Sequence, residues 1–422
     1  MSLAQRIRTN TILKTLAQSA EKRLKRRLTS LLWRLLRAPE ATAIDELGDV
    51  RRILLIRPNY RIGNALISTP AIDAFRSRFP DARLDLLATD KTRGLFDHLP
   101  VDHCHTMTRR AILRPWLLVT LLARLRRERY DLAVQLVPGS LTGAICTRLI
   151  GAQTTMGRAK PEQRWFDIEV EGATPHAYDA PRPFAHALGV ACRNRPRLHL
   201  SHDEQARAEA TLAHCLPAVE PASVKPDTAG VTPTCEPFVA VFIGGHLDKR
   251  LPWAQWFDIL NALEAANQRH LVCLGPEEAD LAPTISHHLE GSRFGALCPP
   301  QPLRDFAALV ARSGVLISPD SGPLHLAAAL EVPTIALMQV KKSQKFVPRE
   351  PHDQALWRPT AEEVVQAVTR LDLFRRTYIK AVVTASPSAV WRPMTGTPRD
   401  SAMASKRRLG SMSGLTRRTA RA

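Results

Sequence analysis

Short apolar runs alternate with amphipathic stretches along most of the chain. Continuous apolar runs are typical of strands buried on both faces of a parallel sheet. The predicted strands cover residues 52–57, 84–88, 130–137, 238–243, 270–274, 315–318 and 334–338. Apolar positions at helical spacing predict helices over about residues 64–79, 115–128, 140–149, 253–267, 277–289, 303–312, 322–330 and 361–371. Strands that alternate with helices predict an α/β fold with crossover connections.

This alternation occurs in two blocks. It weakens after Gly151, and residues 220–236 are rich in Pro, Thr and Ala, which is typical of a linker. We therefore expect two Rossmann-like, doubly wound domains that face a cleft. The expected parts are a basic amphipathic extension (1–45), a first domain (46–220), a linker (221–237), a second domain (238–375) and a disordered basic tail (376–422).

Positive charge is concentrated at the two ends of the chain. The net charge is +19, and residues 1–40 contain ten Lys and Arg against two acidic residues. Basic residues and Trp33 accompany apolar positions at helical spacing there, a pattern that suits an anionic membrane surface. The alternative is a helix packed on the protein body with a solvated basic face. Helix-turn-helix, zinc-finger and RNA-binding signatures are lacking, so nucleic acid is not a predicted partner.

Seven cysteines lie far apart without a C-x-x-C pair, which predicts reduced thiols and neither a zinc nor a redox motif. An apolar run of about 18 residues, as a membrane span requires, is lacking. The N-terminal residues do not have the pattern of a signal peptide. We therefore expect a cytoplasmic protein without a metal or cofactor. The sequence leaves its oligomeric state open.

The first candidate site follows the first predicted strand, in the loop that begins at Arg57 and includes Arg61, Gly63 and Asn64. Ligands of open α/β sheets bind at the carboxyl ends of strands. A helix that begins just after Gly63 presents free N–H groups to an anion, and the arginines add cationic donors. The alternative is an ordinary turn in which Gly63 serves backbone geometry.

The second candidate site, Ser318–Leu330, also follows a strand and begins a helix. Asp320 or Ser321 can cap that helix, and Gly322 allows the backbone to approach a ligand. The N–H groups at the start of the helix would bind a diphosphate, and His325 could donate to a phosphate. The alternative is a capped helix with a histidine on its surface.

Two further strand-end segments carry charge. Lys249 follows a Gly-Gly pair, and it is either a phosphate ligand or a solvated side chain. Glu277 and Glu278 follow the strand 270–274; they either bind ribose hydroxyls or favour the start of a helix through its dipole. For Trp253 and Trp256 we expect packing on the sheet.

Four ordered segments, residues 53–82, 248–260, 274–278 and 318–337, together resemble the lipopolysaccharide heptosyltransferases of glycosyltransferase family 9. The resemblance extends from about residue 51 to residue 371. It implies a GT-B fold with the acceptor on the first domain and the nucleotide-sugar donor on the second. It further implies inverting, metal-independent glycosyl transfer from ADP-heptose to a lipid-linked, anionic saccharide acceptor, by an enzyme at the inner face of the inner membrane.

Individual residues match the motifs of the family. Lys249 matches the lysine that contacts donor phosphates, and Glu277 or Glu278 matches the acid that binds ribose. The residues that match the diphosphate-binding segment are Asp320, Ser321, Gly322 and His325. The matching acceptor loop contains Arg57, Arg61, Gly63 and Asn64.

Two positions depart from the family pattern. Asn64 stands where the family commonly has an aspartate that serves as general base, and an amide cannot take up a proton as a carboxylate does. Asp90 and Asp97 are the candidate substitutes, while Asn64 could still orient an acceptor hydroxyl. Gln135 also replaces an aspartate that relatives often carry. The alternative function is therefore a catalytically weak or silent relative that binds nucleotide-sugar or glycolipid.

Overall fold

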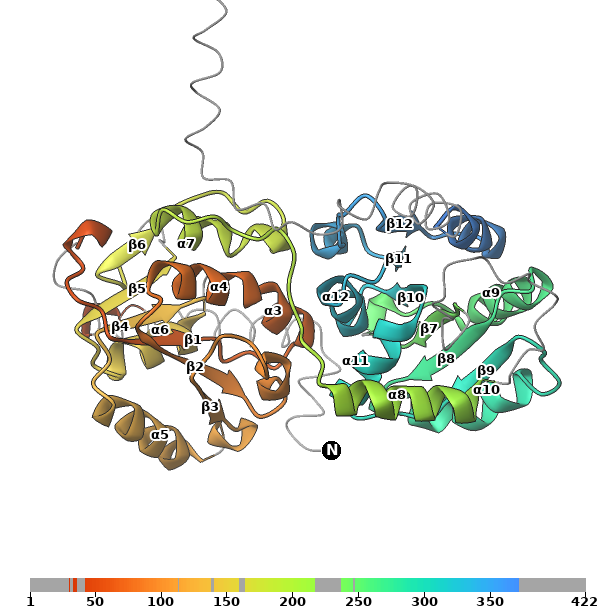
Figure 1. The fold of residues 1–422 in the computed structure, drawn as a ribbon, viewed down its shortest axis with the longest axis horizontal. Coiled ribbons are helices and arrows are strands. Elements are labelled where there is room, and N and C mark those ends of the chain that lie inside the picture. The colour runs from red at the N-terminus through yellow and green to blue at the C-terminus, as the bar shows by residue number, and fades with distance from the viewer. Residues whose placement is uncertain are drawn as a thin grey trace, which may run out of the picture. The chain divides into compact units, whose positions relative to one another are not determined.

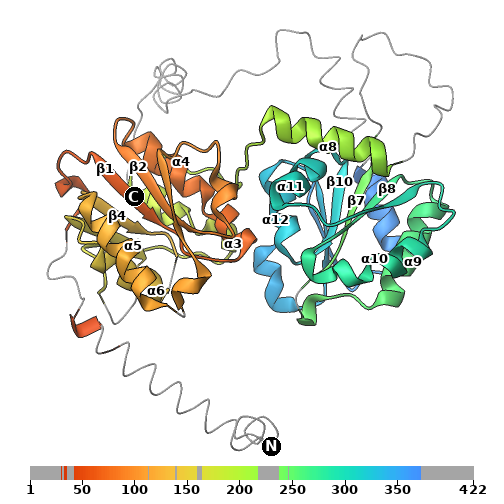
Figure 2. The same cartoon turned by 90° about the horizontal axis from the view of Figure 1, so that it is seen from below.

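The computed structural model describes residues 42–371 except 113, 138–139, 159–163, 217–236 and 246, together with residues 30 and 33–35. The described residues form two parallel sheets covered by helices (Figures 1 and 2). The expected tail, nearly all of the expected linker and most of the N-terminal extension lie outside the described residues.

The first sheet has six parallel strands in the order β3-β2-β1-β4-β5-β6. Its strands are β1 (Arg52–Ile56), β2 (Arg83–Thr89), β3 (His103–Met107), β4 (Leu132–Gln135), β5 (Thr154–Arg158) and β6 (Ile168–Val170). Ile56, at the end of β1, pairs with Leu87 on one side and Gln135 on the other.

The second sheet repeats this arrangement, with the order β12-β11-β10-β7-β8-β9 and parallel pairing throughout. Its strands are β7 (Val239–Ile243), β8 (His270–Leu274), β9 (Gly295–Cys298), β10 (Val315–Pro319), β11 (Thr334–Met338) and β12 (Gln354–Trp357). Both orders are that of a doubly wound Rossmann sheet, in which ligands bind where the strand order reverses. The reversals lie between β1 and β4 and between β7 and β10.

Helices connect the strands as crossovers. The α-helices are α3 (Ile62–Ile67), α4 (Thr69–Arg78), α5 (Pro115–Arg127), α6 (Leu141–Leu149), α7 (Arg182–Ala187), α8 (His202–Cys215), α9 (Trp253–Ala265), α10 (Ala282–His288), α11 (Leu303–Arg312) and α12 (Gly322–Ala329). Residues 361–371 are also helical. The 3-10 turns are η1 (Ile44–Glu46), η2 (Arg93–Phe96), η3 (Arg109–Ile112), η4 (Ala177–Asp179), η5 (Leu247–Lys249), η6 (Pro276–Leu281) and η7 (Lys341–Phe346).

Alternate residues of each strand pack against helices on opposite faces of the sheet, as a strand with period two requires. In the first sheet, Ile53 and Leu55 pack with α4 and α7, whereas Leu54 and Ile56 pack with α5 and α6 (Figures 1 and 2). In the second sheet, Val239, Val241 and Ile243 pack with α9, α10 and the helix 361–371. Alternate residues of the neighbouring strands pack with α8, α11 and α12.

The predicted strands and helices are confirmed, with two divisions. The helix expected over residues 277–289 begins as the 3-10 turn η6 and becomes α10 at Ala282. The helix expected over residues 64–79 is two helices that meet at Ser68. Pro70 has no N–H to donate to Leu66 four residues earlier, and the Thr69 hydroxyl donates to the Leu66 carbonyl instead, at 2.8 Å. The prediction missed β3, β5, β6, β9 and β12 and the helices α7 and α8.

The helix α8 and the residues just before it contact the helices that cover the second sheet. Arg304 of α11 forms an ion pair with the buried Glu204 of α8, and Arg207 of α8 bonds Asp305 at 2.7 Å. Just upstream, Leu198 N–H donates to the Ala329 carbonyl at 3.2 Å. The chain therefore reaches the second sheet before α8 begins.

The described residues of the N-terminal extension pack on the protein body. Residues 30 and 33–35 are helical, and the Trp33 indole donates to the Arg164 carbonyl at 2.9 Å. Trp33 also packs beside Trp165 and Phe166. This packing on the protein body favours the alternative interpretation for this end of the extension. None of the described helices is long and apolar enough to cross a membrane.

A buried polar network fixes the amino-terminal end of the first sheet. Asp85 is fully buried and accepts hydrogen bonds from Tyr130 Oη at 2.7 Å and Arg83 at 2.8 Å, with His105 Nε2 at 3.4 Å. Burial raises the pKa of Asp85, but these hydrogen bonds outweigh it and lower the pKa below its usual value of 3.8. The carboxylate therefore stays charged in the folded protein at neutral pH.

We expect Asp85→Asn to lower the free energy of unfolding by about 2 kcal/mol at pH 7, because a buried bond to a charged acceptor is weakened. Urea denaturation measures this change, with the exposed Asp81→Asn as the control. Because the folded state lowers the pKa, the stabilisation is complete above pH 4 and is lost as the pH falls through the folded pKa. A variant as stable as the control would contradict the role of the network.

Candidate active site

The loops at the carboxyl ends of β1, β7, β8 and β10 carry most of the predicted site residues. In the first sheet these are residues 57–61 and the start of α3, beside the reversal between β1 and β4. In the second sheet they are residues 244–249, η6 and the start of α12. The fold therefore brings them to the sheet edges where open α/β sheets bind ligands.

Gly63 of α3 lies against His325 of α12. A Cβ atom at Gly63 would be 2.1 Å from His325 Cδ2 and 2.7 Å from Nε2, so any other side chain requires a shift. On the same side, Gly322 faces Ile62, with 3.4 Å from an added Cβ to the Ile62 Cβ. The lack of a side chain at Gly63 therefore permits the close approach of α3 and α12.

His325 is buried and does not lie open at the start of α12. Its Nδ1 is 2.8 Å from Tyr178 Oη, and Tyr178 is buried in η4. Burial lowers the pKa of His325 to about 4, and Asp320 counteracts this only in part. The imidazole is therefore neutral at neutral pH. Its ring joins α12 to Gly63 and Tyr178.

Lys249 and Asp320 form an ion pair at the start of α12. The side chain of Asp320 is 6% exposed and that of Lys249 30%, so the ammonium group remains in reach of solvent. Ser321 stands at the N-cap position, but its hydroxyl is 3.0 Å from Ser318 Oγ and does not cap the helix. Free backbone N–H groups at the start of a helix, with a cation beside them, suit an anion.

Glu278 and Glu277, which the sequence left as alternatives, differ in environment. Glu278 is buried, and its Oε1 accepts from Arg250 Nη2 at 2.8 Å. Burial raises the pKa of Glu278, while Arg250 acts in the opposite direction. A Cβ atom at Gly275 would lie 2.6 Å from Glu278 Oε2, so the glycine makes room for this carboxylate. Glu277 is exposed on η6.

On the first sheet, Arg57 is buried and serves the backbone. Its Nη2 and Nε donate to the Asn64 carbonyl at 2.5 and 3.2 Å, and burial lowers the pKa of Arg57 to about 10. The side chain of Asn64 is half-buried and forms no hydrogen bond with another described residue. Arg61 is exposed, and its N–H donates to Asn59 Oδ1 at 2.8 Å.

Asp90 lies at the same edge as this loop. It is exposed directly after β2, and its N–H donates to the Met107 carbonyl at the end of β3. Burial raises the pKa of Tyr60, and Asp90 raises it further, whereas Arg109 lowers it, so these charges lie near the phenol. Tyr60 Oη is buried without a hydrogen-bond partner among the described residues. Asp97 is exposed at the end of η2.

Gln135, at the reversal point of the first sheet, has a local role. Its Nε2 donates to the carbonyls of Val137 at 2.9 Å and Ser140 at 2.7 Å. An aspartate could not donate in this way. The glutamine therefore holds the turn between β4 and α6.

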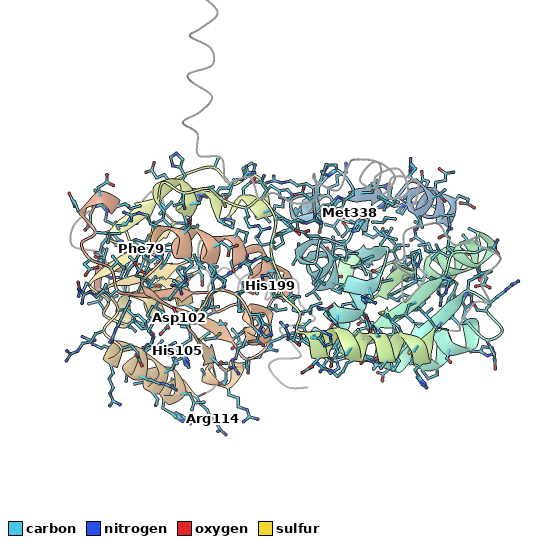
Figure 3. The ribbon with its side chains drawn as sticks, viewed as in Figure 1. Phe79, Asp102, His105, Arg114, His199 and Met338 are labelled. Carbon is cyan, nitrogen blue, oxygen red and sulfur yellow. The ribbon has the colours of Figure 1, made fainter. Side chains whose placement is uncertain are left out.

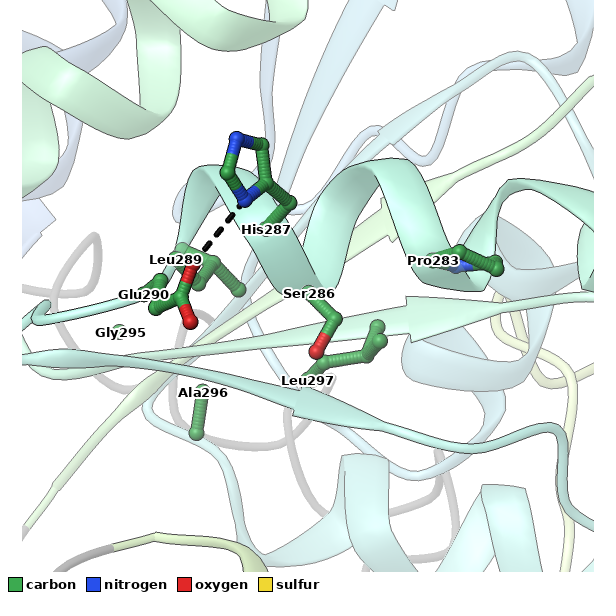
Figure 4. A pocket seen from close by; sticks show the side chains of 8 residues that line it. All are labelled: Pro283, Ser286, His287, Leu289, Glu290, Gly295, Ala296 and Leu297. Carbon is green, nitrogen blue, oxygen red and sulfur yellow. Dashed lines mark hydrogen bonds and ion pairs between the residues drawn. The ribbon is translucent and has the colours of Figure 1, made fainter.

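A hollow of about 560 Å³ lies elsewhere, between α10 and β9 (Figure 4). It is lined by Pro283, Ser286, His287, Leu289, Glu290, Gly295, Ala296 and Leu297. Two of its side chains, His287 and Glu290, are exposed, with His287 Nδ1 3.0 Å from Glu290 Oε2. It includes none of the predicted site residues. Among the described residues, the structure holds no group of three or more potential metal ligands, and the six described cysteines are free thiols.

The family model for "Glycosyltransferase family 9 (heptosyltransferase)" matches residues 118–372, which is more than half of the chain. The chain belongs to this family. It is therefore a glycosyltransferase, as the four sequence segments predicted.

Curated relatives agree with this assignment. A lipopolysaccharide heptosyltransferase 3 of Escherichia coli is 24% identical over 318 residues, which cover 72% of this chain and 85% of the relative. A second lipopolysaccharide heptosyltransferase 3, from E. coli strain K12, is 20% identical over 317 residues.

Solved structures of family 9 glycosyltransferases share the fold. The glycosyl transferase family 9 structure from Veillonella parvula matches with a TM-score of 0.63 at 18% identity, covering 79% of this chain and 99% of that one. E. coli ADP-heptose lps heptosyltransferase II matches with a TM-score of 0.58 at 19% identity, covering 77% and 99%. The prediction of a GT-B fold with two Rossmann-like halves is confirmed.

Sequence reasoning about this family 9 enzyme missed three groups near the predicted residues. Tyr178 lies in the stretch with the weakest pattern, and Arg109 follows a strand that was not predicted. Arg250 stands next to Lys249, and this adjacent pair of cations near a strand end was its one signal in the sequence. Its bond to Glu278 depends on the fold.

We expect Gly63→Ala to lower the free energy of unfolding of this transferase by about 1–3 kcal/mol, the range for overpacking a tight contact. The physical reason is the overlap of the new Cβ with His325. Chemical denaturation provides the measurement. Gly48→Ala is the matched control, because a Cβ atom there meets nothing within 4 Å.

The double variant Gly63→Ala/His325→Ala identifies the cause. If overlap with the ring is responsible, the alanine at position 63 costs little when position 325 is also alanine. An equal cost in both backgrounds would show that the His325 contact is not what requires glycine.

Proposed function

We propose that the enzyme transfers heptose, or a related sugar, from a nucleotide-sugar donor to a lipopolysaccharide core acceptor, and that the donor is ADP-heptose. The observation that carries the proposal is the Lys249–Asp320 ion pair at the start of α12, beside free helix N–H groups. The names of the E. coli relatives support the acceptor class. E. coli heptosyltransferase WaaC with ADP-2-deoxy-2-fluoro heptose, an 18% identical structure of TM-score 0.57, supports the donor class.

The donor would bind at the strand ends of the second sheet. Its diphosphate would accept hydrogen bonds from the N–H groups of Ser321 and Gly322 and from the Lys249 ammonium group. Asp320 would hold Lys249 in place through their ion pair. His325 would fix the position of α12 through its hydrogen bond with Tyr178. Glu277 or Glu278 would accept from ribose hydroxyls. The hydrogen bond from Arg250 orients Glu278 through its Oε1, and Oε2 of Glu278 takes no part in that bond.

The chemical step would be a direct displacement with inversion at the anomeric carbon. The bond from that carbon to the diphosphate breaks while the acceptor oxygen forms the new bond and loses its proton. Lys249 and the α12 N–H groups would stabilise the charge that develops on the departing diphosphate, without a metal. This stabilisation is preorganised, because Lys249 is already held at the start of the helix.

The acceptor would bind at the strand ends of the first sheet, beside Arg61, Gly63 and Asn64. Arg57 would maintain the loop by holding the Asn64 carbonyl. Asp90 is the candidate base, because it is an exposed carboxylate at this edge and lies near Tyr60. Asn64 would orient the acceptor hydroxyl. The acceptor is lipid-linked, so the enzyme would work at the inner face of the inner membrane.

One observation favours a second candidate, a weakly active or silent relative that binds nucleotide-sugar or glycolipid. Both residues at the first reversal point that depart from the family, Asn64 and Gln135, are neutral amides. Gln135 is held by two backbone carbonyls and does not face a substrate through its amide nitrogen. Turnover of ADP-heptose with a core acceptor separates this candidate from the active enzyme.

We expect Lys249→Ala to lower the transfer rate by roughly 10²–10³-fold, the scale for removing one preorganised donor from a charged transition state. Steady-state transfer from ADP-heptose measures the rate, and the exposed Lys342→Ala is the control. A thermal shift with ADP-heptose provides a second measurement, because ligand binding stabilises the folded state. Transfer and thermal shift that match the control would argue against the proposed function.

We expect Asn64→Asp to raise transfer by about tenfold or more if the proton acceptor limits the reaction, since general bases contribute about 10²–10⁴-fold. The pH profile of kcat/KM measures the same effect, because a new base adds a titration on the acidic side. Asp90→Asn is the companion variant, and it should lower transfer in the wild type. Full activity of Asp90→Asn together with no gain from Asn64→Asp would assign the base to another residue.

A further inference from the structure

An unpartnered apolar face lies at the start of α5. Trp116 is 60% exposed, Val119 64% and Leu117 37%, so three large exposed hydrophobic residues fall within one turn. The opposite side of α5 is packed, with Leu122 and Leu125 buried against the first sheet. One apolar stripe of this helix is therefore packed against the sheet, and a second one is exposed to solvent. An exposed apolar patch of this kind marks an interaction surface.

Positive charge surrounds this face. Residues 103–127 contain six arginines and no aspartate or glutamate. The six are Arg109, Arg110, Arg114, Arg124, Arg126 and Arg127. All six are exposed, and none is ion-paired with a residue that the structure describes. Arg114 lies on the outer side of the ribbon beside the start of α5 (Figure 3).

This face adjoins the proposed acceptor edge of the first sheet. β3 ends at Met107, whose carbonyl accepts from the Asp90 N–H, and η3 follows immediately with Arg109 and Arg110. α5 then begins at Pro115. The exposed apolar turn is thus connected by a few residues to the edge that holds Asp90.

We propose that Trp116, Leu117 and Val119, with Arg109, Arg110 and Arg114, form a docking face for an anionic lipid bilayer. Tryptophan and aliphatic side chains gain by entering the headgroup boundary, and arginines bind lipid phosphates around them. α5 has one packed side and is shorter than the about 20 residues of a span, so it lies on the membrane. The occupant rests on the proposed function, because that function has a lipid-linked acceptor.

A nucleic acid is the less suitable occupant of the same arginines. Phosphate backbones attract arginine, but exposed Leu117 and Val119 gain nothing from a charged backbone. A bilayer uses both kinds of residue at once. The two occupants therefore predict different effects for apolar and basic substitutions, which allows one experiment to separate them.

The experiment measures co-sedimentation of the full chain with vesicles of phosphatidylglycerol and phosphatidylcholine, with pure phosphatidylcholine vesicles as the uncharged comparison. We expect Trp116→Ser/Val119→Ser to weaken binding to the anionic vesicles by about tenfold. Arg110→Gln/Arg114→Gln should weaken it by about fivefold per arginine and reduce its salt dependence. Trp357→Ser is the matched control, because Trp357 is 47% exposed on the second sheet.

A second readout reports insertion independently of the amount bound. Vesicles with brominated acyl chains quench tryptophan fluorescence on contact, and this quenching should be lost in Trp116→Phe and retained in Trp357→Phe. Equal sedimentation and equal quenching of the α5 variants and the controls would overturn the docking face. Binding to single-stranded RNA that displaces the vesicles and depends on the arginines but not on Trp116 would also overturn it, in favour of nucleic acid.

The same variants keep this inference separate from the proposed function. The thermal shift with ADP-heptose should be unchanged in the α5 variants, because the donor binds the second sheet. If the α5 variants lose vesicle binding but ADP-heptose gives no thermal shift in the wild type, the docking face stands and the proposed transfer from ADP-heptose is removed. A normal thermal shift with ADP-heptose but no vesicle binding would remove the docking face and leave the proposed function standing.

Discussion

The close approach of α3 and α12 at Gly63 and His325 is the constraint on which the rest of the site depends. α12 is held at three points: at its start by the Lys249–Asp320 ion pair, in its middle by His325 with Tyr178, and at its end by Leu198. Because the Gly63 backbone meets the His325 ring, the strand-end loops of the first sheet come to the helix whose start is the proposed anion site. A buried neutral ring makes this contact without placing a charge between the two sheets.

Much of the fold could be predicted from the sequence because its central strands are continuous apolar runs. Strands whose burial depends on tertiary partners could not. β3 contains His103 and His105, and His105 is buried only because Asp85 and Tyr130, from other elements, bond to it. A periodicity argument has no access to such compensation. The helix expected over residues 64–79 is interrupted just before Pro70, and the Thr69 hydroxyl that compensates for the missing backbone bond appears only in the structure.

The candidate site shows the same division between local and long-range information. Lys249, Asp320, Glu278 and Gly63 could be found separately, because each follows an apolar strand within a few residues. Their pairing could not be found, since Lys249 and Asp320 are 71 positions apart and Tyr178 meets His325 across 147. The α5 surface was overlooked for a different reason. Its apolar residues all recur at helical spacing in the sequence. Only their burial in the structure shows that one apolar stripe of that helix is packed and the other is exposed.

The ion pair of Lys249 and Asp320 also has an electrostatic consequence for selectivity. The chain carries a net charge of +19, yet the cation at the start of α12 is already balanced by a neighbouring carboxylate. Stray phosphates drawn in by the overall field therefore meet a nearly neutral locus there, where long-range attraction counts for little. In the proposed donor site, discrimination among anions would then depend on the fit of several directional hydrogen bonds, which would favour an extended pyrophosphate over a small inorganic ion.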